Sequence, residues 1–316
     1  MTWPRAINPL EGESFWVREA EPTARPLSLA AAYEACHQIM ERNAHAFSFA
    51  ARFVPLPKRR AIWAIYALLR HSDDLVDRAP ATATRADLLA AVDHWEGQIR
   101  AGDTTSSILR AFADTRIHFA VPLDPLWDLF EGMRMDLLRS RYRTWAELER
   151  YCYCVAGTVG LLCTPVLGYN GDAETLRDAA NLGIAMQLTN ILRDVGEDLT
   201  LGRIYLPQEE LIAFGYSEEK AHAGVVDRAF RELMRFQIAR ARALYRQSMP
   251  AIARLDRGSH LPIHAAAVLY GGVLGRIEAN DYQVFTRRAH LTTRDKVARL
   301  PGIWWQSRRL SMVEPT

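Results

Sequence analysis

Two carboxylates one helical turn apart stand in the segment Arg70-His71-Ser72-Asp73-Asp74-Leu75-Val76-Asp77. On a helix, Asp73 and Asp77 share a face, with their Cβ atoms about 6 Å apart. Two like charges at that spacing repel, and the apolar residues before them (AIWAIYALL) favour a place at the rim of a cavity rather than in open solvent. The pair therefore predicts a bound cation.

A second polar row lies further along the chain. Asn190, Asp194 and Asp198 follow one another at four-residue intervals, with Gln187 almost in line. On a helix these side chains form one stripe of oxygen donors. Carboxylates and an amide, without histidine or cysteine, suit a hard cation such as Mg²⁺, with Mn²⁺ as a substitute. Because Mg²⁺ usually recruits substrate phosphates to complete its coordination, the stripe predicts phosphate binding close by.

Cationic and hydroxyl side chains accompany both acidic motifs. Arg70 precedes the first, Arg193 lies inside the second, and Arg203 and Tyr205 follow it in LGRIYLP. Arginine binds phosphate oxygens in a planar, bidentate geometry. One isolated acidic pair is more often a solvated helix end with ordinary ion pairs. Two such motifs, each in an apolar helix and beside arginine, favour a helical enzyme that binds Mg²⁺ and a diphosphate ester.

Helical spacing of apolar residues runs through almost the whole chain after Leu27, and no strand alternation lasts long enough to build a sheet. We find no internal repeat or long linker, so we expect one all-helical domain at residues 28–310, a partly ordered N-terminal arm at 1–27 and a tail at 311–316. Prolines and glycines at the joints indicate the following helices: 28–52, 58–79, 86–101, 105–119, 124–139, 145–168, 173–199, 207–214, 217–248, 260–287 and 293–308.

The composition is that of an ordinary globular protein. Of 316 residues, 49% are hydrophobic and 24% charged, and the net charge of +2 gives no global field that points to nucleic acid. Residues 231–310 hold 15 basic and 5 acidic side chains, which indicates either a solvated face or attraction to anionic substrate or lipid headgroups. The four cysteines show neither zinc spacing nor the density of a disulfide scaffold, so a reducing cytoplasm is expected.

The segment from Tyr151 to Gly171 carries no charge and is long enough to cross a bilayer. Glycine and proline interrupt it, and Arg150 and Asp172 flank it, so we favour a deeply buried helix of a bundle. Together with the uncharged segment 258–275, it either walls a channel for a long hydrocarbon or forms plain core. The residues alone leave that choice open.

The sequence resembles the phytoene and squalene synthase family, the head-to-head branch of the all-α prenyltransferases, in three segments: HSDDLVD, YCYCVAGTVG and QLTNILRDVGEDLTLGRIYLP. The similarity runs from about Ala32 to Leu300, and IEANDYQVFTRRAH resembles the bacterial phytoene-forming members in particular. The resemblance implies an all-α fold, a single-domain isoprenoid-synthase helical bundle with a central apolar cavity.

The resemblance also implies roles for individual residues. The metal ions that bridge to the substrate diphosphate would be held by Asp73, Asp77, Asn190, Asp194 and Asp198. The substrate would contact Arg70, Phe47, Val155, Val159, Gly160, Gln187, Asn190, Arg203, Tyr270 and Arg287. The candidate catalytic residues are the four motif aspartates, as ligands rather than nucleophiles, and Tyr151 and Tyr205, which would steer charge or protons.

The sequence departs from the family pattern near the first helix. Where many relatives read HSKSF or SSSF, residues 43–47 read NAHAF, so a serine and a lysine that help hold the diphosphate in those relatives are missing. Ala51 stands where similar thirty-carbon synthases can carry a bulky aromatic near the pocket floor. A missing ring deepens the channel, which favours a twenty-carbon substrate.

The activity that the resemblance implies is condensation of two geranylgeranyl diphosphates, through a cyclopropyl (prephytoene) diphosphate, to phytoene in carotenoid biosynthesis. Departure of diphosphate leaves an allylic cation, so the protein must position, stabilise and exclude water. Phytoene formation ends in proton loss, so NADPH is not expected. One alternative is a squalene, dehydrosqualene or presqualene diphosphate synthase that uses farnesyl diphosphate. The other is a non-catalytic relative that acts as an assembly factor.

The expected partners are prenyl diphosphate substrates, without nucleic acid, and the sequence leaves the oligomeric state unknown. A cytoplasmic location is expected, and the oily product has to leave towards a bilayer. The basic C-terminal quarter with Trp304 and Trp305 indicates either peripheral contact with the inner membrane face or packing of a last helix onto the core.

Overall fold

The computed structural model describes residues 28–44, 51–52 and 54–310, in which the β-pairing amounts to two isolated bridges. The predicted all-α class is confirmed. The predicted arm and tail, and Phe47, lie outside the described residues. The elements are α1 (Leu29–Asn43), α3 (Leu56–Asp77), α4 (Arg85–Arg100), α5 (Ser107–Phe119), α6 (Asp124–Leu138), α7 (Trp145–Cys152), the π-helical turn η1 (Tyr153–Gly157), α8 (Thr158–Leu167), α9 (Ala173–Thr200), α10 (Gln208–Ala213), α11 (Glu218–His222), α12 (Arg228–Ser248), the 3₁₀ turn η2 (Met249–Arg254), α13 (Arg257–Ala279) and α14 (Thr293–Leu310).

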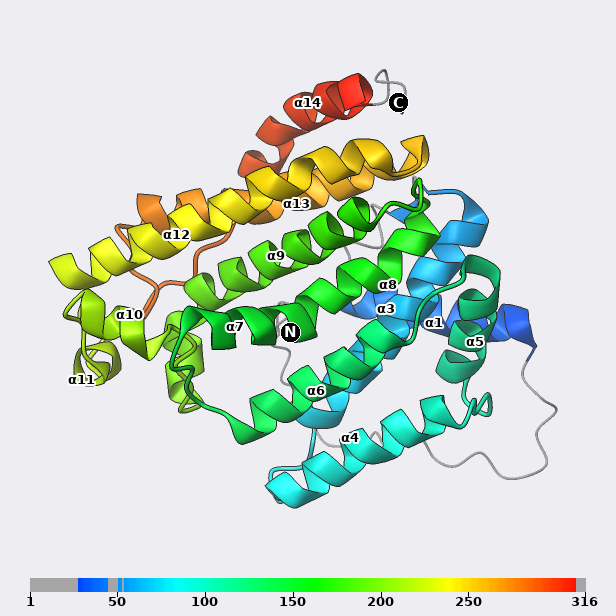
Figure 1. Ribbon diagram of the computed structural model, residues 1–316, viewed down its shortest axis with the longest axis horizontal. Coiled ribbons are helices and arrows are strands. Elements are labelled where there is room, and N and C mark those ends of the chain that lie inside the picture. Colours follow the sequence, from blue (N-terminus) through cyan, green and yellow to red (C-terminus); the bar gives the residue numbers. More distant parts are fainter. Residues whose placement is uncertain (1–27, 45–50, 53, 311–316) are drawn as a thin grey trace.

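The helices form a stack with α9 near its centre (Figure 1). On one side, α12 and α13 pack on α9, and α14 covers α13. On the other side, α8 packs on α9, α6 on α8, and α4 on α6. The helices α1, α3 and α5 pack against one another beside this stack, and α3 contacts α8. The two helices with acidic motifs, α3 and α9, therefore both border α8.

The predicted buried helix is found in the middle of the bundle. The elements α7, η1 and α8 form one continuous apolar helical span, Trp145–Leu167. In its most apolar 18-residue stretch, 61% is buried. The π-helical turn carries one extra residue per turn, so it rotates the residues after it relative to those before it. Tyr151 and Val155 consequently lie in one cluster of buried residues, whereas Val159 and Gly160 face a cavity.

Two predicted helices have other boundaries because of turns that the apolar spacing does not reveal. The segment 217–248 is two helices, α11 and α12. Between them, Gly224 takes a left-handed φ of 63°, and Asp227 accepts a hydrogen bond of 2.9 Å from the backbone N–H of Phe230 at the start of α12. The first predicted helix, 28–52, ends as α1 at Asn43, because Ala44 leaves the helical conformation with φ −145°.

The predicted helix 260–287 is wrong at both ends. It begins earlier, at Arg257, and it ends at Ala279. Beyond Asn280, Asp281 and Tyr282 adopt left-handed φ angles of 53° and 61°, which no α-helix can continue through. The residues from 280 to 292 therefore form a connecting segment, and Arg287 does not lie on a helix.

The last helix, α14, turns its tryptophans outward. Ile303 and Ser307 are buried, and Ser307 Oγ lies 3.1 Å from Nδ1 of His264 on α13. Trp304 and Trp305 are 50% and 51% exposed. The packing of α14 onto the bundle thus depends on Ile303 and Ser307 rather than on the two tryptophans.

The backbones of η1 and α9 approach so closely that one position requires glycine. A Cβ on Gly183 would lie 2.3 Å from the carbonyl oxygen of Ala156. We expect Gly183→Ala to lower the free energy of unfolding by about 1–3 kcal/mol or more, because the two backbones must separate. Its matched control is Gly97→Ala in α4, where a Cβ meets nothing within 4 Å and should raise stability by about 0.5–1 kcal/mol. Similar urea unfolding midpoints for the two variants would contradict this packing.

Candidate active site

An apolar cavity of about 200 Å³ lies among η1, α8, α9, η2 and α13. On α9 its lining runs from Thr175 to Asn190, which is about 22 Å at 1.5 Å per residue. Gln187 and Asn190 lie at one end of this run, and Thr175 and Asp178 at the other. The predicted central apolar cavity is therefore present, and it favours a hydrocarbon channel over plain core.

The cavity gathers half of the predicted substrate-contacting residues. They come from three elements that are far apart in sequence: Val159, Gly160, Gln187, Asn190 and Tyr270. Between these residues the walls are mainly aliphatic or small, with Leu182 and Ala251 among them. The site thus joins a few polar groups at one end to a long apolar interior, as a ligand with a polar head and a hydrocarbon tail requires.

Asn190 and Asp198 are buried polar groups on the central helix. Oδ1 of Asn190 has no hydrogen-bond partner in the described residues, while its Nδ2 lies 3.4 Å from Oε1 of Gln187. Burial, followed by the nearby charges of Asp194 and Asp136, raises the pKa of Asp198 to about 7. An unpaired amide oxygen and a carboxylate that resists ionisation both favour a nearby cation.

Asp194, between them on the helix, already has cationic partners. Arg193 and Arg288 each donate from Nε to its Oδ1 at 2.8 Å, and each also donates from Nη2 to its Oδ2. Burial would raise the pKa of Asp194, but the two arginines hold it below its usual range. Sequence reasoning did not single out Arg288. Its neighbour Arg287, predicted as a diphosphate contact, is exposed.

The first acidic motif lies at the end of α3. Oδ2 of Asp73 is buried and has no hydrogen-bond partner among the residues that the structure describes. Burial, with a further contribution from Asp77, raises the pKa of Asp73 to about 7. Arg70 donates to Asp74, which also forms an ion pair with Nε of Arg78 at 3.1 Å. Asp77 is exposed at the last turn of the helix.

Two buried or part-buried tyrosines, Tyr66 on α3 and Tyr270 on α13, have acidic-motif residues among the groups that influence their pKa. Burial, with Asp73 and Tyr270 among the nearby groups, raises the pKa of Tyr66 on α3 to about 12. Burial also raises the pKa of Tyr270, which lies within electrostatic range of Arg193 and Asp194.

The donor set fits a divalent cation that shares its coordination with phosphate. Within the described ranges, no three His, Cys, Asp or Glu side chains gather tightly enough to hold a metal ion by themselves. Two buried oxygens, Oδ2 of Asp73 and Oδ1 of Asn190, nevertheless have no hydrogen-bond partner among the described residues, which favours a positive group beside each. Mg²⁺ is commonly bound by one or two carboxylates together with water and substrate phosphate, so these residues suit it.

Three tyrosines stack beside the second motif, and an aspartate that sequence reasoning missed holds one of them. The rings of Tyr151 and Tyr205 are 5.2 Å apart at 24°, with Tyr142 packed against both. Oη of Tyr205 donates to Asp136 Oδ1 at 2.7 Å. Burial, followed by the charge of Asp136, raises the pKa of Tyr151 and of Tyr205 well above its usual value. Asp136 is one of four acidic residues on α6, and no sequence spacing connects it to Tyr205.

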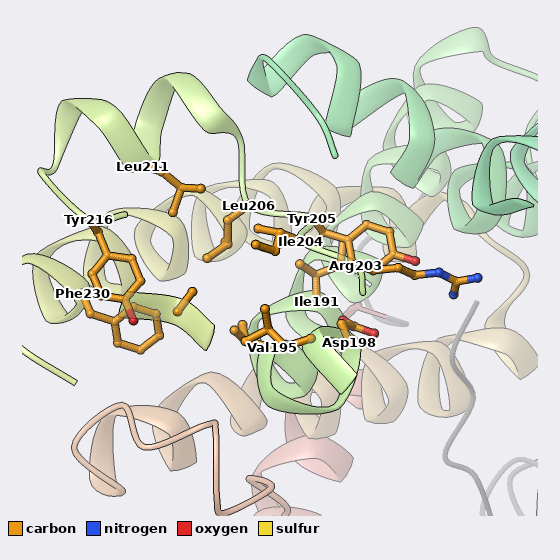
Figure 2. A pocket seen from close by; sticks show the side chains of 12 residues that line it. Ile191, Val195, Asp198, Arg203, Ile204, Tyr205, Leu206, Leu211, Tyr216 and Phe230 are labelled. Carbon is orange, nitrogen blue, oxygen red and sulfur yellow. The ribbon is translucent and has the colours of Figure 1, made fainter. Parts of the chain in front are cut away.

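Arg203 and Asp198 lie at one end of a second, small pocket of about 10 Å³, whose other end is formed by Leu211, Tyr216 and Phe230 (Figure 2). Nη2 of Arg203 donates to the backbone oxygen of Asp136 at 3.2 Å. Burial would lower the pKa of Arg203, but Asp136 and other nearby groups raise it overall, so the guanidinium stays charged. A volume of this size holds about one water molecule, so this pocket is not a substrate channel.

We expect Tyr205→Phe to lower kcat for product formation by about 10–100-fold, because the hydroxyl bound to Asp136 is lost. Tyr142→Phe is the matched control. It belongs to the same stack, but its hydroxyl has no hydrogen-bond partner in the described part of the chain. Steady-state kinetics on both variants checks this prediction. Equal losses in the two would assign the stack a packing role only.

The two departures from the family pattern, at Ala51 and at residues 43–47, lie in different surroundings. Ala51 is buried in an apolar cluster that includes Met40 and Trp63, and it is not among the residues that line the cavity. The cavity wall opposite α9 is instead made by η1, α8, η2 and α13. Of residues 43–47, only Asn43 and Ala44 are described, and Nδ2 of Asn43 donates to the backbone oxygen of Ile39.

Comparison with known proteins bears on the identity of this site. Residues 40–295 match the squalene/phytoene synthase family. The chain belongs to that family. A 15-cis-phytoene synthase from Synechocystis sp. is 42% identical over 324 residues, covering 98% of this chain and 95% of that protein. A chloroplastic phytoene synthase from an Oncidium hybrid cultivar is 41% identical, covering 94% and 73% respectively.

The fold of this squalene/phytoene synthase agrees with solved structures. A crystal structure of a dehydrosqualene synthase in complex with ligand matches with a TM-score of 0.81 at 28% identity, over 89% of this chain and 98% of that one. The predicted family, fold and prenyltransferase class are therefore confirmed. No comparison tests the individual site residues, whose roles stay predictions.

Proposed function

We propose that this protein is a phytoene synthase that condenses two geranylgeranyl diphosphates head to head, without NADPH, for carotenoid biosynthesis. The single observation that carries the proposal is the apolar cavity that ends at Gln187, Asn190 and Tyr270, where the second acidic motif begins. The names of the cyanobacterial and plant relatives support phytoene rather than a farnesyl-derived product.

The polar end of the cavity supplies the residues that receive the diphosphate. As a prenyltransferase, the chain belongs to a class that generally uses a divalent metal. Mg²⁺, or Mn²⁺ in its place, would be held by Asp73 and Asp77 on α3 and by Asn190, Asp194 and Asp198 on α9. When bound, the metal neutralises charge on the departing diphosphate. Arg70, Arg193, Arg203 and Arg287 would add positive charge around the same group.

The remaining steps belong to the chain and the substrates. The double bond of the second substrate attacks the first allylic cation, and loss of a proton from the resulting cation closes the ring of the cyclopropyl diphosphate. The second ionisation and rearrangement end in loss of a proton. The aliphatic walls exclude water, which would quench either cation. Tyr151 and Tyr205, held by Asp136, would orient charge near the reacting carbons.

Product analysis with purified protein tests this function. The protein is incubated with Mg²⁺ and either geranylgeranyl or farnesyl diphosphate, each with and without NADPH, and the hydrocarbons are identified by mass. We expect a forty-carbon product from geranylgeranyl diphosphate in both NADPH arms. Exclusive use of farnesyl diphosphate would assign the protein to the squalene or dehydrosqualene branch, and the absence of any product would favour a non-catalytic assembly factor.

We also propose that the enzyme works in the cytoplasm as a peripheral membrane protein. The support is the outer face of α14, where Val297, Leu300, Trp304 and Trp305 are at least half exposed. Arg308 and Arg309 lie over the rings of Trp304 and Trp305 at 4.4 and 3.7 Å. Tryptophan and arginine on one exposed helix face suit the boundary between lipid headgroups and acyl chains, towards which an oily product must leave.

Flotation with liposomes of anionic phospholipid tests the membrane proposal. We expect the wild-type protein to float with the liposomes, and the double variant Trp304→Ser, Trp305→Ser to remain at the bottom. Ile212→Ser is the matched control, because Ile212 is 79% exposed on α10, away from α14. Equal flotation of the wild type and the double variant would contradict the proposal.

A further inference from the structure

Arg288 forms a bidentate, hydrogen-bonded ion pair with Asp194, to which the proposed function gives no role. Both oxygens of Asp194 accept hydrogen bonds from two guanidinium groups, those of Arg193 and Arg288. The side chain of Asp194 is 2% exposed, that of Arg193 10% and that of Arg288 37%. Arg288 therefore covers Asp194 on the side that faces solvent.

Several contacts of the neighbouring backbone fix the position of Arg288. We call residues 280–292, between α13 and α14, the strap. At its start, Asp281 accepts from Nε of Arg231 at 3.0 Å, and Oη of Tyr282 accepts from Nε of Arg235 at 3.1 Å. The strap then crosses α9 at Gly196, where a Cβ would lie 2.6 Å from Cα of Phe285. A larger residue at position 196 would push the strap away from Asp194.

The contact is incompatible with metal binding at Asp194. Two guanidinium groups already occupy the hydrogen-bonding positions of one carboxylate, so a divalent cation can coordinate Asp194 only after one guanidinium leaves. Arg193 is on the same helix as Asp194 and is buried. Arg288 lies within the strap, is partly exposed and also lies 3.8 Å from Glu197, so it is the group that can move.

We propose that Arg288 is a removable counter-ion. It neutralises Asp194 in the metal-free protein, leaves this carboxylate when a divalent metal binds, and then contacts the substrate diphosphate. The inference rests on the proposed function of the same site. It makes metal and diphosphate binding mutually dependent, because the arginine that a metal displaces becomes a ligand for the anion that the metal recruits.

Binding measurements on Arg288→Gln, without any prenyl substrate, test the inference. Mn²⁺ affinity is measured by titration calorimetry of metal-free protein, and inorganic pyrophosphate affinity is measured in the presence of Mg²⁺. We expect Arg288→Gln to bind Mn²⁺ about tenfold more tightly than the wild type and pyrophosphate about tenfold more weakly. Arg294→Gln is the matched control. It removes the same charge from an exposed position on α14, and both affinities should stay at the wild-type values.

Unchanged or weaker Mn²⁺ binding by folded Arg288→Gln would overturn the inference and leave Arg288 as a fixed partner that orients Asp194. Circular dichroism and thermal unfolding establish that the variant is folded. A variant that fails to fold is replaced by Arg288→Lys, which keeps the charge but loses the bidentate contact, and whose Mn²⁺ affinity should also rise. Failure of the wild type to form phytoene, with normal Mn²⁺ binding, would overturn the proposed function instead.

Discussion

Phytoene formation is expected to fall by about 10³-fold when Asp73 is replaced by asparagine, because a metal ligand contributes several kcal/mol to stabilising the departing charge. The same substitution should not weaken the metal-free fold. Burial raises the pKa of Asp73 to about 7, and Oδ2 of Asp73 lacks a partner in the described residues. At pH 8 the folded wild-type protein must therefore hold a buried charge that the neutral amide of asparagine does not carry.

The sign of the pH dependence follows from the raised pKa of Asp73. Between pH 4 and 7 the folded wild-type protein binds a proton at Asp73 more readily than the unfolded chain does, so the stability from this group is lost as the pH rises. In the presence of EDTA, the unfolding midpoint of Asp73→Asn minus that of the wild type should grow over this range.

A matched control for Asp73→Asn is Asp93→Asn. Asp93 is an exposed partner of Arg134, so both activity and stability should change little. Full activity of Asp73→Asn with Mg²⁺ would contradict the role of Asp73.

Substrate length is expected to switch when the deep part of the cavity is filled. Ala179 lines the cavity on α9, eleven residues or about 16 Å from Asn190. In Ala179→Phe, a ring would occupy the space of the last isoprene unit of a geranylgeranyl chain and leave room for a farnesyl chain. We expect kcat/KM for geranylgeranyl diphosphate relative to farnesyl diphosphate to fall by about 100-fold.

A graded series separates shortening of the channel from damage to the fold. Ala179→Val should shift the ratio less than Ala179→Phe, and both variants should keep activity with farnesyl diphosphate, which shows that they are folded. Competition between the two substrates, read by product mass, gives the ratio directly. Undiminished selection of the twenty-carbon substrate by Ala179→Phe would show that the hydrocarbon lies elsewhere.

The parts of the molecule that repeat a local pattern are predictable from sequence. The four-residue spacing of Asn190, Asp194 and Asp198 requires only that α9 be a helix, and the apolar spacing establishes that it is. The cavity follows less directly. The sequence identified the apolar segment that forms η1 and α8, but only packing shows that Val159 and Gly160 face an open space.

The parts that depend on backbone turns or on distant contacts are not predictable in this way. Aspartate tolerates a left-handed φ but tyrosine rarely adopts one, so the sequence does not predict the left-handed pair Asp281 and Tyr282 that follows α13. Nor does it predict that Arg288, rather than Arg287, is the partner of Asp194. Asp136 and Tyr205 are 69 residues apart, and their hydrogen bond forms where the segment after α6 pairs with the segment after α9, with Ile204 N–H donating to the backbone oxygen of Ser140. Such contacts arise from tertiary structure, and the local periodicity of a sequence does not predict them.

We infer that the acidic motifs of α3 and α9 serve one diphosphate above one hydrocarbon cavity. Diffraction from crystals soaked with Mn²⁺ and inorganic pyrophosphate tests it most directly, since anomalous scattering locates the metal. We predict Mn²⁺ peaks beside Asp73 and beside Asn190 and Asp194, with a single pyrophosphate bridging them at the polar end of the cavity. Pyrophosphate bound to one motif alone, or Mn²⁺ remote from the cavity, would contradict the account.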